Sequence, residues 1–558
     1  PKLIENLLDV IDYQEMPPEE EPQIPMAKRN ELVSSLKRLL VEAIESKKSD
    51  FKKRALSRLN RFQYNNAVRD LFDLKMDVFE LPEKMMIRQA NYLNSKDRKM
   101  PHRVRVVSNS RNSTPGMKDV NPFPKDLRAA HGFDNQQDQL TLSPLLLDSF
   151  LKLSVSILES PDFNRKTVGK WTQLFEAPEN NHSVETSVRQ RLSNFMPLAF
   201  RSSVDRETID RYVSYALNMI NKQKSYELGM KKTISGVLSS PLFLFRHETI
   251  AGDKAYRLAS DLSFMLWGSG PDHQLQKAAE SGKILDESYL RQTFERMIND
   301  PKIQRFLDSF PSQWLQLDRI ISSVPDPKKY PDFYYAPPNY RTTMDMMMEP
   351  LLLFETVLIE NLPITQFIDS DFTYRSSLLQ EAYGDLALGE EPDKPKSEVT
   401  VLNFKRIPVD DRRSGGLITN AAVMTMNSGP ERTKPITRGA WIASVIFNNP
   451  PEPPPADVPP LGEEPAEEEA HLTLRERLAQ HRERADCRGC HEKIDPLGFA
   501  LENYGPVGDW RTQYSNGRKV DMSGTLFREH SFTDIIEFKD ALLEQKQRYN
   551  LGFIKIKY

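Results

Sequence analysis

Both cysteines of the chain stand in one short motif, Cys487-Arg488-Gly489-Cys490-His491. Cys-x-x-Cys-His is the spacing to which a c-type haem is covalently attached. The two thiols add across the vinyl groups of the porphyrin, and the histidine that follows can ligate the iron through a ring nitrogen. The motif therefore predicts one covalent haem c in this chain, with Cys487 and Cys490 as the anchors and His491 as the proximal ligand.

Two other uses of a closely spaced cysteine pair stay open at this point. A structural zinc site would normally need a second pair of Cys or His ligands at similar spacing, and the nearest histidines, His481 and His530, form no such pair. A disulfide oxidoreductase would place the motif at the start of a helix after a strand, whereas here a Pro/Glu-rich segment and a charged helix precede it. The haem interpretation is the strongest of the three.

The chemistry of a haem depends on the ligand at its other face. Met522 is the first distal candidate, Met424 and Met426 follow, and His530 is weaker. A methionine ligand favours an electron carrier of moderate to high potential, and a histidine ligand favours a lower potential. An iron with an open face would permit peroxide or small-ligand chemistry. For each candidate the ordinary alternative is a core methionine or a surface histidine.

The segment directly after the motif can supply the haem pocket. Leu497, Phe499 and Leu501 would form an apolar wall that excludes water and tunes the potential. A ligating histidine also needs an acceptor for its second ring nitrogen, which fixes the orientation of the ring. The backbone carbonyl of Pro496 or of a neighbouring residue is the expected acceptor for His491.

Composition limits the remaining classes of function. Of 558 residues, 39% are hydrophobic and 28% are charged, which is typical of a soluble globular protein with several domains. A net charge of −3 gives no electrostatic reason to expect nucleic acid as a partner. No apolar run approaches the length of a transmembrane helix. Because c-type haem is attached outside the cytoplasm, we expect a periplasmic or otherwise extracytoplasmic protein. A chain that starts at Pro1 is expected to be a processed or incomplete product.

Hydrophobic periodicity and capping signals predict a mainly α-helical chain. Residues 85–125 and 386–415 are polar and irregular, and both are expected to be loops, while 369–374 are expected to form a turn. The Pro/Glu-rich stretch 450–469 is expected to be an extended strap or semi-rigid linker. Helices are expected at 29–46, from Asn60 and Ser143 onward, after Asp205, at 256–268, through Ile359, within 433–448 and, after the capping box of Thr473 and Glu476, at 474–484.

Near the N-terminus, Glu15-Met16-Pro17-Pro18 is similar to the loop that carries the distal methionine in small cytochrome c domains. The attachment motif of such a domain would lie upstream of Pro1. From these residues alone a Pro-rich linker with an incidental methionine is the preferred interpretation.

Taken together, ordered motifs along the chain resemble a known family, the planctomycete-type multidomain cytochrome c proteins built from DUF1587, DUF1595, DUF1592, DUF1588 and DUF1585 modules. The matching residues include Arg58-Leu59-Asn60-Arg61, Leu142-Ser143-Pro144-Leu145-Leu146, Ser240-Pro241-Leu242-Phe243-Leu244-Phe245-Arg246, Leu266-Trp267-Gly268, Asp369-Ser370-Asp371-Phe372, Gly415-Gly416-Leu417, Asp495-Pro496-Leu497-Gly498-Phe499-Ala500-Leu501-Glu502 and Ser523-Gly524. Two departures are Asn420, where a histidine is expected in many relatives, and Met522, where a small residue is common.

The resemblance implies a serial domain organisation and a second haem. In the family a separate cytochrome c domain precedes the early module, so Met16 becomes a distal-ligand candidate for a second, N-terminal haem in the full-length protein. The expected divisions are the tail of that domain at 1–28, an early helical module at 29–160, a short one at 185–250, a helical module at 251–390, the haem-bearing module at 408–510 and a truncated C-terminal module at 515–558.

These observations lead to one functional hypothesis and two rivals. The chain is expected to be an exported c-type cytochrome that exchanges single electrons with one or more redox partner proteins. The first rival is a haem enzyme, either peroxidase-like or the haem subunit of a dehydrogenase. The second is a structural component of a large multi-haem complex or homo-oligomer, because the helical bulk far exceeds what one haem needs.

Overall fold

The structure is a computed structural model. The side chains of Cys487 and Cys490 and most of the strap 450–469 lie outside the part that can be described, as do residues 546–558. Within the described part, no helix combines the length and apolar character needed to cross a membrane. The described residues are 2–12, 16–17, 21–46, 57–81, 84, 86–88, 92–94, 97–108, 115–126, 132–135, 140, 143–179, 183–246, 254–336, 340–386, 401–451, 462–463, 465–481 and 485–545.

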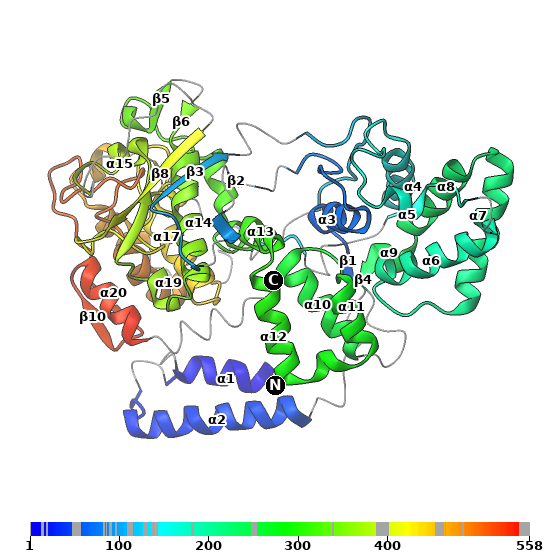
Figure 1. Cartoon of the computed structure of the whole chain (residues 1–558). Helices are drawn as coiled ribbons and strands as arrows, with labels where there is room; N and C mark the ends of the chain where they lie inside the picture. Colours follow the sequence, from blue (N-terminus) through cyan, green and yellow to red (C-terminus); the bar gives the residue numbers. More distant parts are fainter. Residues whose placement is uncertain are drawn as a thin grey trace. The chain divides into compact units, whose positions relative to one another are not determined.

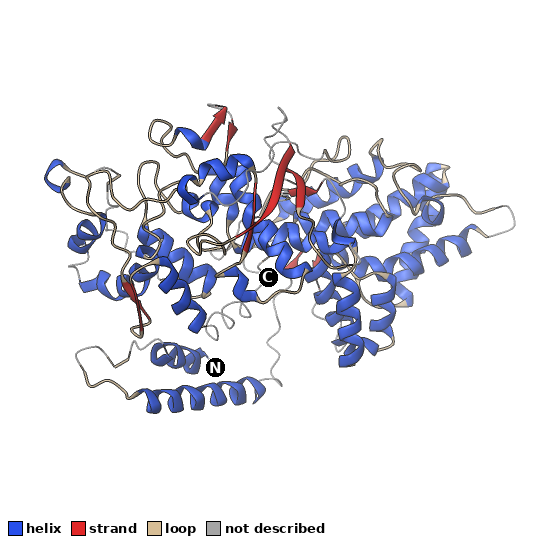
Figure 2. Ribbon diagram, turned by 60° about the vertical axis from the view of Figure 1, so that its left-hand side comes forward, coloured by secondary structure: helices blue, strands red, loops and turns tan. Residues whose placement is uncertain are grey.

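The chain forms two compact units, each of which is described by itself. The motif unit comprises Pro1–Ala55, Asn427–Pro506 and Trp510–Lys555, and the large unit comprises Leu56–Met426, Val507–Asp509 and Ile556–Tyr558. Helices dominate in both, with few and short strands (Figure 2). The expectation of a mainly α-helical protein built from several small modules is confirmed.

Helices of the large unit begin where the sequence offers caps. Asn60 and Gln63 form a complete capping box at the first of them, and the Ser143 side chain accepts from the amide of Leu146. Asp205 caps another in the same way. The α-helices are α3 Arg61–Phe72, α4 Pro144–Glu159, α5 Trp171–Leu174, α6 Val184–Phe200, α7 Arg206–Gln223, α8 Tyr226–Leu238, α9 Pro241–Leu244, α10 Lys254–Trp267, α11 His273–Glu280, α12 Glu287–Ile298, α13 Gln304–Trp314, α14 Thr343–Ile359, α15 Ser377–Ala382 and α16 Ala421–Met426.

A four-stranded antiparallel sheet in the large unit corrects the sequence prediction. Segments expected to be loops or a turn contribute its strands, in the order β2 (Met86–Arg88), β3 (Arg103–Ser108), β8 (Val401–Pro408) and β7 (Phe372–Arg375) (Figure 1). The central pair joins residues far apart in the sequence, with Val104 opposite Phe404. Shorter pairs are β1 (Ser57–Arg58) with β4 (Phe245–Arg246) and β5 (Tyr334–Ala336) with β6 (Tyr340–Arg341).

The motif unit has two parts. At the N-terminus, α1 (Lys2–Asp12) and α2 (Met26–Ser46) lie side by side around Leu8, Val33 and Leu36 (Figure 1). The second part contains α17 (Pro435–Trp441), a π-helical turn at Ile442–Ile446, α18 (Leu474–His481), α19 (Ala485–Phe499), the hairpin of β9 (Gly524–Leu526) and β10 (His530–Phe532), and α20 (Ile535–Glu544). The predicted capping box of Thr473 and Glu476 is present at the start of α18.

Candidate haem-attachment site

The whole Cys-x-x-Cys-His motif lies in the first turns of α19. Cys487, Cys490 and His491 occupy positions i, i+3 and i+4, so their Cα–Cβ bonds leave the helix on one face. This spacing on a helix is compatible with a covalently held, histidine-ligated porphyrin, while the side chains of the two cysteines lie outside the described part.

The imidazole of His491 is held by a carboxylate one turn further along the helix. Its Nδ1 lies 2.9 Å from Oδ1 of Asp495, which is buried. Because an ionised carboxylate only accepts hydrogen bonds, Nδ1 carries the proton in this pair and Nε2 keeps the lone pair that would ligate a metal. The sequence predicts the backbone carbonyl of Pro496 or of a neighbouring residue as the acceptor, but the contact is made by the side chain of Asp495, and the Pro496 oxygen accepts the amide of Ala500 at 3.2 Å.

The predicted apolar wall is buried within the module itself. Leu497, Phe499 and Leu501 are all buried, and Pro496 lies inside α19. Phe499 packs in a small core with Leu474 and Leu478 of α18. The packing of Phe499 therefore holds α19 against α18. A contact between the apolar wall and a haem stays a prediction.

Two glycines set the distance between α17 and α19. A Cβ on Gly439 would overlap the carbonyl oxygen of Ile494 and lie 2.9 Å from its carbon. Reciprocally, a Cβ on Gly498 would overlap the carbonyl oxygen of Pro435. The backbones of the two helices are thus in direct contact (Figure 1), which only glycine allows at both positions.

A fully buried arginine next to this crossing closes the C-terminal end of α19. The guanidinium of Arg438 donates to the carbonyls of Leu501, Tyr504 and Gly505 at 2.7 to 2.8 Å, and to the Ser428 hydroxyl at 3.0 Å. These carbonyls lie just beyond the helix, where the partial negative charge of the helix dipole favours a cation. Arg438 therefore fixes the segment that follows the haem motif.

A second buried polar cluster ties that segment to the start of α17. The fully buried carboxylate of Glu502 accepts from the hydroxyl of Thr433 at 2.5 Å and from the guanidinium of Arg511 at 2.6 Å. Burial and the nearby Glu502 charge raise the pKa of Tyr514 far above its usual value, so its phenol stays neutral. The family-like run from Asp495 to Glu502 is thus the structural centre of the module.

Arg475 places Met522, the first distal candidate, beside α19. Its guanidinium lies 4.1 Å from the centre of the Phe499 ring and donates to the carbonyls of Asp521 and Ser523 at 2.9 and 2.7 Å. Met522, between those carbonyls, is 4% exposed. Beyond it, Arg528 at the tip of the β9–β10 hairpin pairs with Glu492, the residue after His491. The segment that carries Met522 therefore runs along the motif helix.

The other predicted ligands lie in different surroundings. Met424 and Met426 are buried in α16 of the large unit, where Thr425 between them donates to the sulfur of Met346. The two nitrogens of His530 contact Glu544 at 2.8 Å and Gln545 at 2.6 Å near the end of α20, which disfavours this histidine as a ligand.

Met16 is 52% exposed beside the helical pair α1 and α2. Among the side chains that can be described, no three His, Cys, Asp or Glu residues gather as a metal site, and the two motif cysteines are not among those side chains. Asp495 was not expected as the partner of His491, because no helix was predicted over 485–499. The spacing of four residues between histidine and acid was the available signal, and it brings the two side chains together only in a helix.

Four family models match the chain. They are described as PSD3, protein of unknown function (DUF1587), at residues 115–160; PSD5 (DUF1595) at 187–248; PSD4 (DUF1592) at 254–384; and PSCyt3 (DUF1588) at 413–514. The last range includes the whole haem motif, and its name points to a cytochrome c-like domain. No curated protein and no solved structure matches the chain. The order of the four modules is the order expected from the resemblance, and the chain belongs to the planctomycete-type family of multidomain cytochrome c proteins.

Proposed function

We propose that the motif unit binds one haem c and that the protein exchanges single electrons with a partner protein through it. Cys487 and Cys490 are the covalent anchors, and Nε2 of His491 is the proximal iron ligand. The observation that carries the proposal is the 2.9 Å contact between Nδ1 of His491 and Asp495 on the helix that carries both cysteines. It supplies the orienting acceptor that metal-ligating histidines generally have.

The residues around the motif fit this group chemically. When bound, a haem c supplies a reversible one-electron couple. The buried Asp495 raises the basicity of His491 more than a neutral carbonyl would, because the acceptor carries a full charge. That electron donation favours ferric iron and therefore a lower potential. The backbone contact at Gly439 and the carbonyl clamp of Arg438 hold the helix rigid, which keeps the histidine in place in both oxidation states.

Met522 is the proposed distal ligand. Its burial and the anchoring of its segment on α19 through Arg475 support this choice over His530, whose ring nitrogens already have partners. Met424 and Met426 stay weaker candidates. We also propose an extracytoplasmic location, as the attachment chemistry requires, and a second haem in the full-length protein with Met16 as its distal ligand.

Spectroscopy of ligand variants tests the proposal. The protein is produced in a periplasm that has the c-type maturation machinery, and the oxidised spectrum is compared for the wild type and the variants Met522→Ala, Met424→Ala, Met426→Ala and His530→Ala. Loss of the weak methionine-to-iron band near roughly 695 nm in Met522→Ala alone would support Met522 as the ligand. Unchanged spectra in Met522→Ala, with loss in one of the other variants, would reassign the ligand. The absence of any haem would sink the proposal.

A haem enzyme is the second candidate, and the Asp495 carboxylate is the observation that favours it. Strong electron donation from a proximal histidine suits peroxide chemistry at an iron with an open distal face. In that case the protein should be high-spin, should bind cyanide and should turn over peroxide. A low-spin spectrum that cyanide does not change would exclude this candidate.

A further inference from the structure

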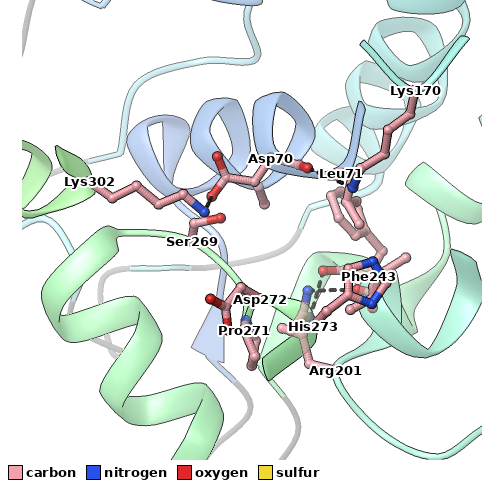
Figure 3. Close-up of a pocket in the computed structure, with 14 residues that line it drawn as sticks. Asp70, Leu71, Lys170, Arg201, Phe243, Ser269, Pro271, Asp272, His273 and Lys302 are labelled. Carbon is pink, nitrogen blue, oxygen red and sulfur yellow. Dashed lines mark hydrogen bonds and ion pairs between the residues drawn. The ribbon is translucent and has the colours of Figure 1, made fainter. Parts of the chain in front are cut away.

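A cavity in the large unit lies far along the sequence from the haem motif and has no part in the proposed electron transfer. Its volume is about 150 Å³. The lining comes from α3, the end of α6, α9, the loop between α10 and α11, and two isolated lysines, Lys170 and Lys302 (Figure 3). It thus lies where the segments matched by the PSD5 and PSD4 models meet α3, and such junctions commonly hold small-molecule sites.

Cations outnumber anions around this cavity. Lys170, Lys302 and Arg201 line it, together with two carboxylates, Asp70 and Asp272. Both carboxylates already have arginine partners outside the lining. Arg305 binds Asp70 with two hydrogen bonds of 2.7 and 2.9 Å, and Arg296 binds Asp272 at 2.7 and 3.3 Å. The three lining cations are therefore left with a net positive charge.

Arg201 is the cation in this lining whose charge is buried without a carboxylate partner among the described residues. It is 6% exposed, and its guanidinium donates only to backbone carbonyls, those of Ala199, Leu242, Phe243 and Phe245, at 2.8 to 3.2 Å. Burial lowers its pKa to about 9, so it remains charged at neutral pH. No described carboxylate influences its pKa, whereas the charge of Arg246 lowers it further, and a buried charge without a counter-ion is costly.

The two lysines add to this excess. Lys170 donates to the backbone carbonyl of Asp70 at 3.2 Å, and Lys302 lies 3.1 Å from the Asp70 carboxylate, which it shares with Arg305. Burial lowers the pKa of Lys170, and repulsion from Lys302 lowers it further against the pull of Asp73 and Asp70. A bound anion would relieve this repulsion.

Two neutral polar groups complete the lining. Ser269 is 1% exposed, and its hydroxyl interacts with the Asp70 carboxylate, which helps to lower the pKa of that carboxyl. His273 begins α11 at the edge of the cavity, and burial together with the Lys170 charge lowers its pKa, which favours the neutral ring. Both can donate a hydrogen bond to an oxyanion, and Figure 3 shows Ser269 next to the ion pair of Asp70 and Lys302.

We propose that this cavity binds a small oxyanion, of the phosphate or carboxylate type, at the junction of the helical modules. Three cations line a space that can hold one small polyatomic ion, and the buried hydroxyl of Ser269 lies on its wall. The apolar side chains of Leu71, Leu198, Phe243 and Pro271 close the remainder of the lining and restrict the size of the ligand. The site is independent of the haem and of its redox state.

Isothermal titration calorimetry and thermal unfolding of the full chain, at constant ionic strength held with chloride, test the proposal. Inorganic phosphate and malonate are the two probes, and the tighter one identifies the type of anion. The variants are Lys170→Met and Lys302→Met, with Lys166→Met as the control because Lys166 is exposed and lies outside the lining.

We expect saturable binding of one probe, a higher unfolding temperature in its presence, and binding at least about tenfold weaker in each cavity variant, since each loses a charge-assisted hydrogen bond. Absence of saturable binding to both probes would overturn the proposal, and so would equal affinity in the wild type and both cavity variants. Haem content does not enter either outcome.

Discussion

The crossing of α17 and α19 gives the sharpest structural prediction, for the substitution Gly439→Ala. The added methyl group would overlap the carbonyl oxygen of Ile494 and would lie 2.9 Å from its carbon and 3.0 Å from the amide nitrogen of Gly498. All three atoms belong to the backbone, so no side chain can rotate away. Relief requires the two helices to separate, which also disturbs the carbonyl clamp of Arg438 next to the crossing. Ordinary overpacking costs about 1–3 kcal/mol, and a backbone collision should cost at least the upper value.

Hydrogen exchange measured by mass spectrometry is the suitable assay, because a chain with two compact units need not unfold in one step. Peptides covering 435–441 and 485–499 should lose protection in Gly439→Ala. Gly236→Ala, in α8, is the matched control, since its methyl group would meet only a ring carbon of Tyr212 in α7, at 3.9 Å. Alanine there should be neutral or stabilising by up to about 1 kcal/mol. Wild-type protection of both peptides in Gly439→Ala would refute the backbone contact.

Two further predictions follow from individual side chains of the motif unit. Asp495→Asn should raise the reduction potential of the proposed haem by roughly 40–60 mV. The variant replaces a charge-assisted hydrogen bond by a neutral one, which removes about 1–1.5 kcal/mol of selective stabilisation of the ferric state. A potentiometric titration that shows no change would contradict the role of the carboxylate. Arg438→Met should destabilise the motif unit by at least about 3 kcal/mol, since it leaves buried carbonyls without donors, and the loss of protection around 501–505 measures it.

The fourth prediction concerns how the stability of the large unit depends on pH. Burial alone would raise the pKa of Asp70, but Arg305 and Lys302 outweigh it and hold that pKa well below its usual range. The stabilisation is therefore fully present above about pH 4, the unfolded value, and is lost as the pH falls toward the lowered folded value. In acid-unfolding experiments Asp70→Asn should be less stable than wild type at pH 7, and the difference should shrink below about pH 4. A difference that is independent of pH would contradict this account.

Local signals in the sequence predicted the helices well. Asn60 with Gln63, and Thr473 with Glu476, form the capping boxes that their types and spacing indicate. The sheet was missed because most of its strands stand in segments of polar composition and the two central strands pair across a long stretch of sequence. In β3, Val104 and Val106 are buried while Arg103 and Arg105 are exposed, so the alternation was present but lay within a segment whose overall polarity indicated a loop.

The motif residues of the candidate site could be recognised in the sequence, but the residue that orients His491 could not. Covalent attachment of a haem would fix the spacing of Cys487, Cys490 and His491, so the sequence alone singles these residues out, and their role stays a prediction. The acceptor for His491 depends on whether the residues after the motif are helical. Because α19 extends through Pro496, the Pro496 carbonyl bonds within the helix, and the Asp495 side chain lies next to the imidazole. The cavity proposed to bind an oxyanion had no sequence signature, because Lys170, Arg201 and Lys302 come together only through tertiary packing.

Covalent haem content is the measurement that tests the central claim most directly. The protein, produced with the c-type maturation machinery, is denatured and extracted with acidified acetone, and the pyridine haemochrome spectrum of the remaining polypeptide is recorded alongside that of the double variant Cys487→Ser, Cys490→Ser. The account predicts a haem c spectrum, with one haem for this stretch of chain, that the double variant lacks. A polypeptide without haem, or haem that the double variant retains, would contradict it.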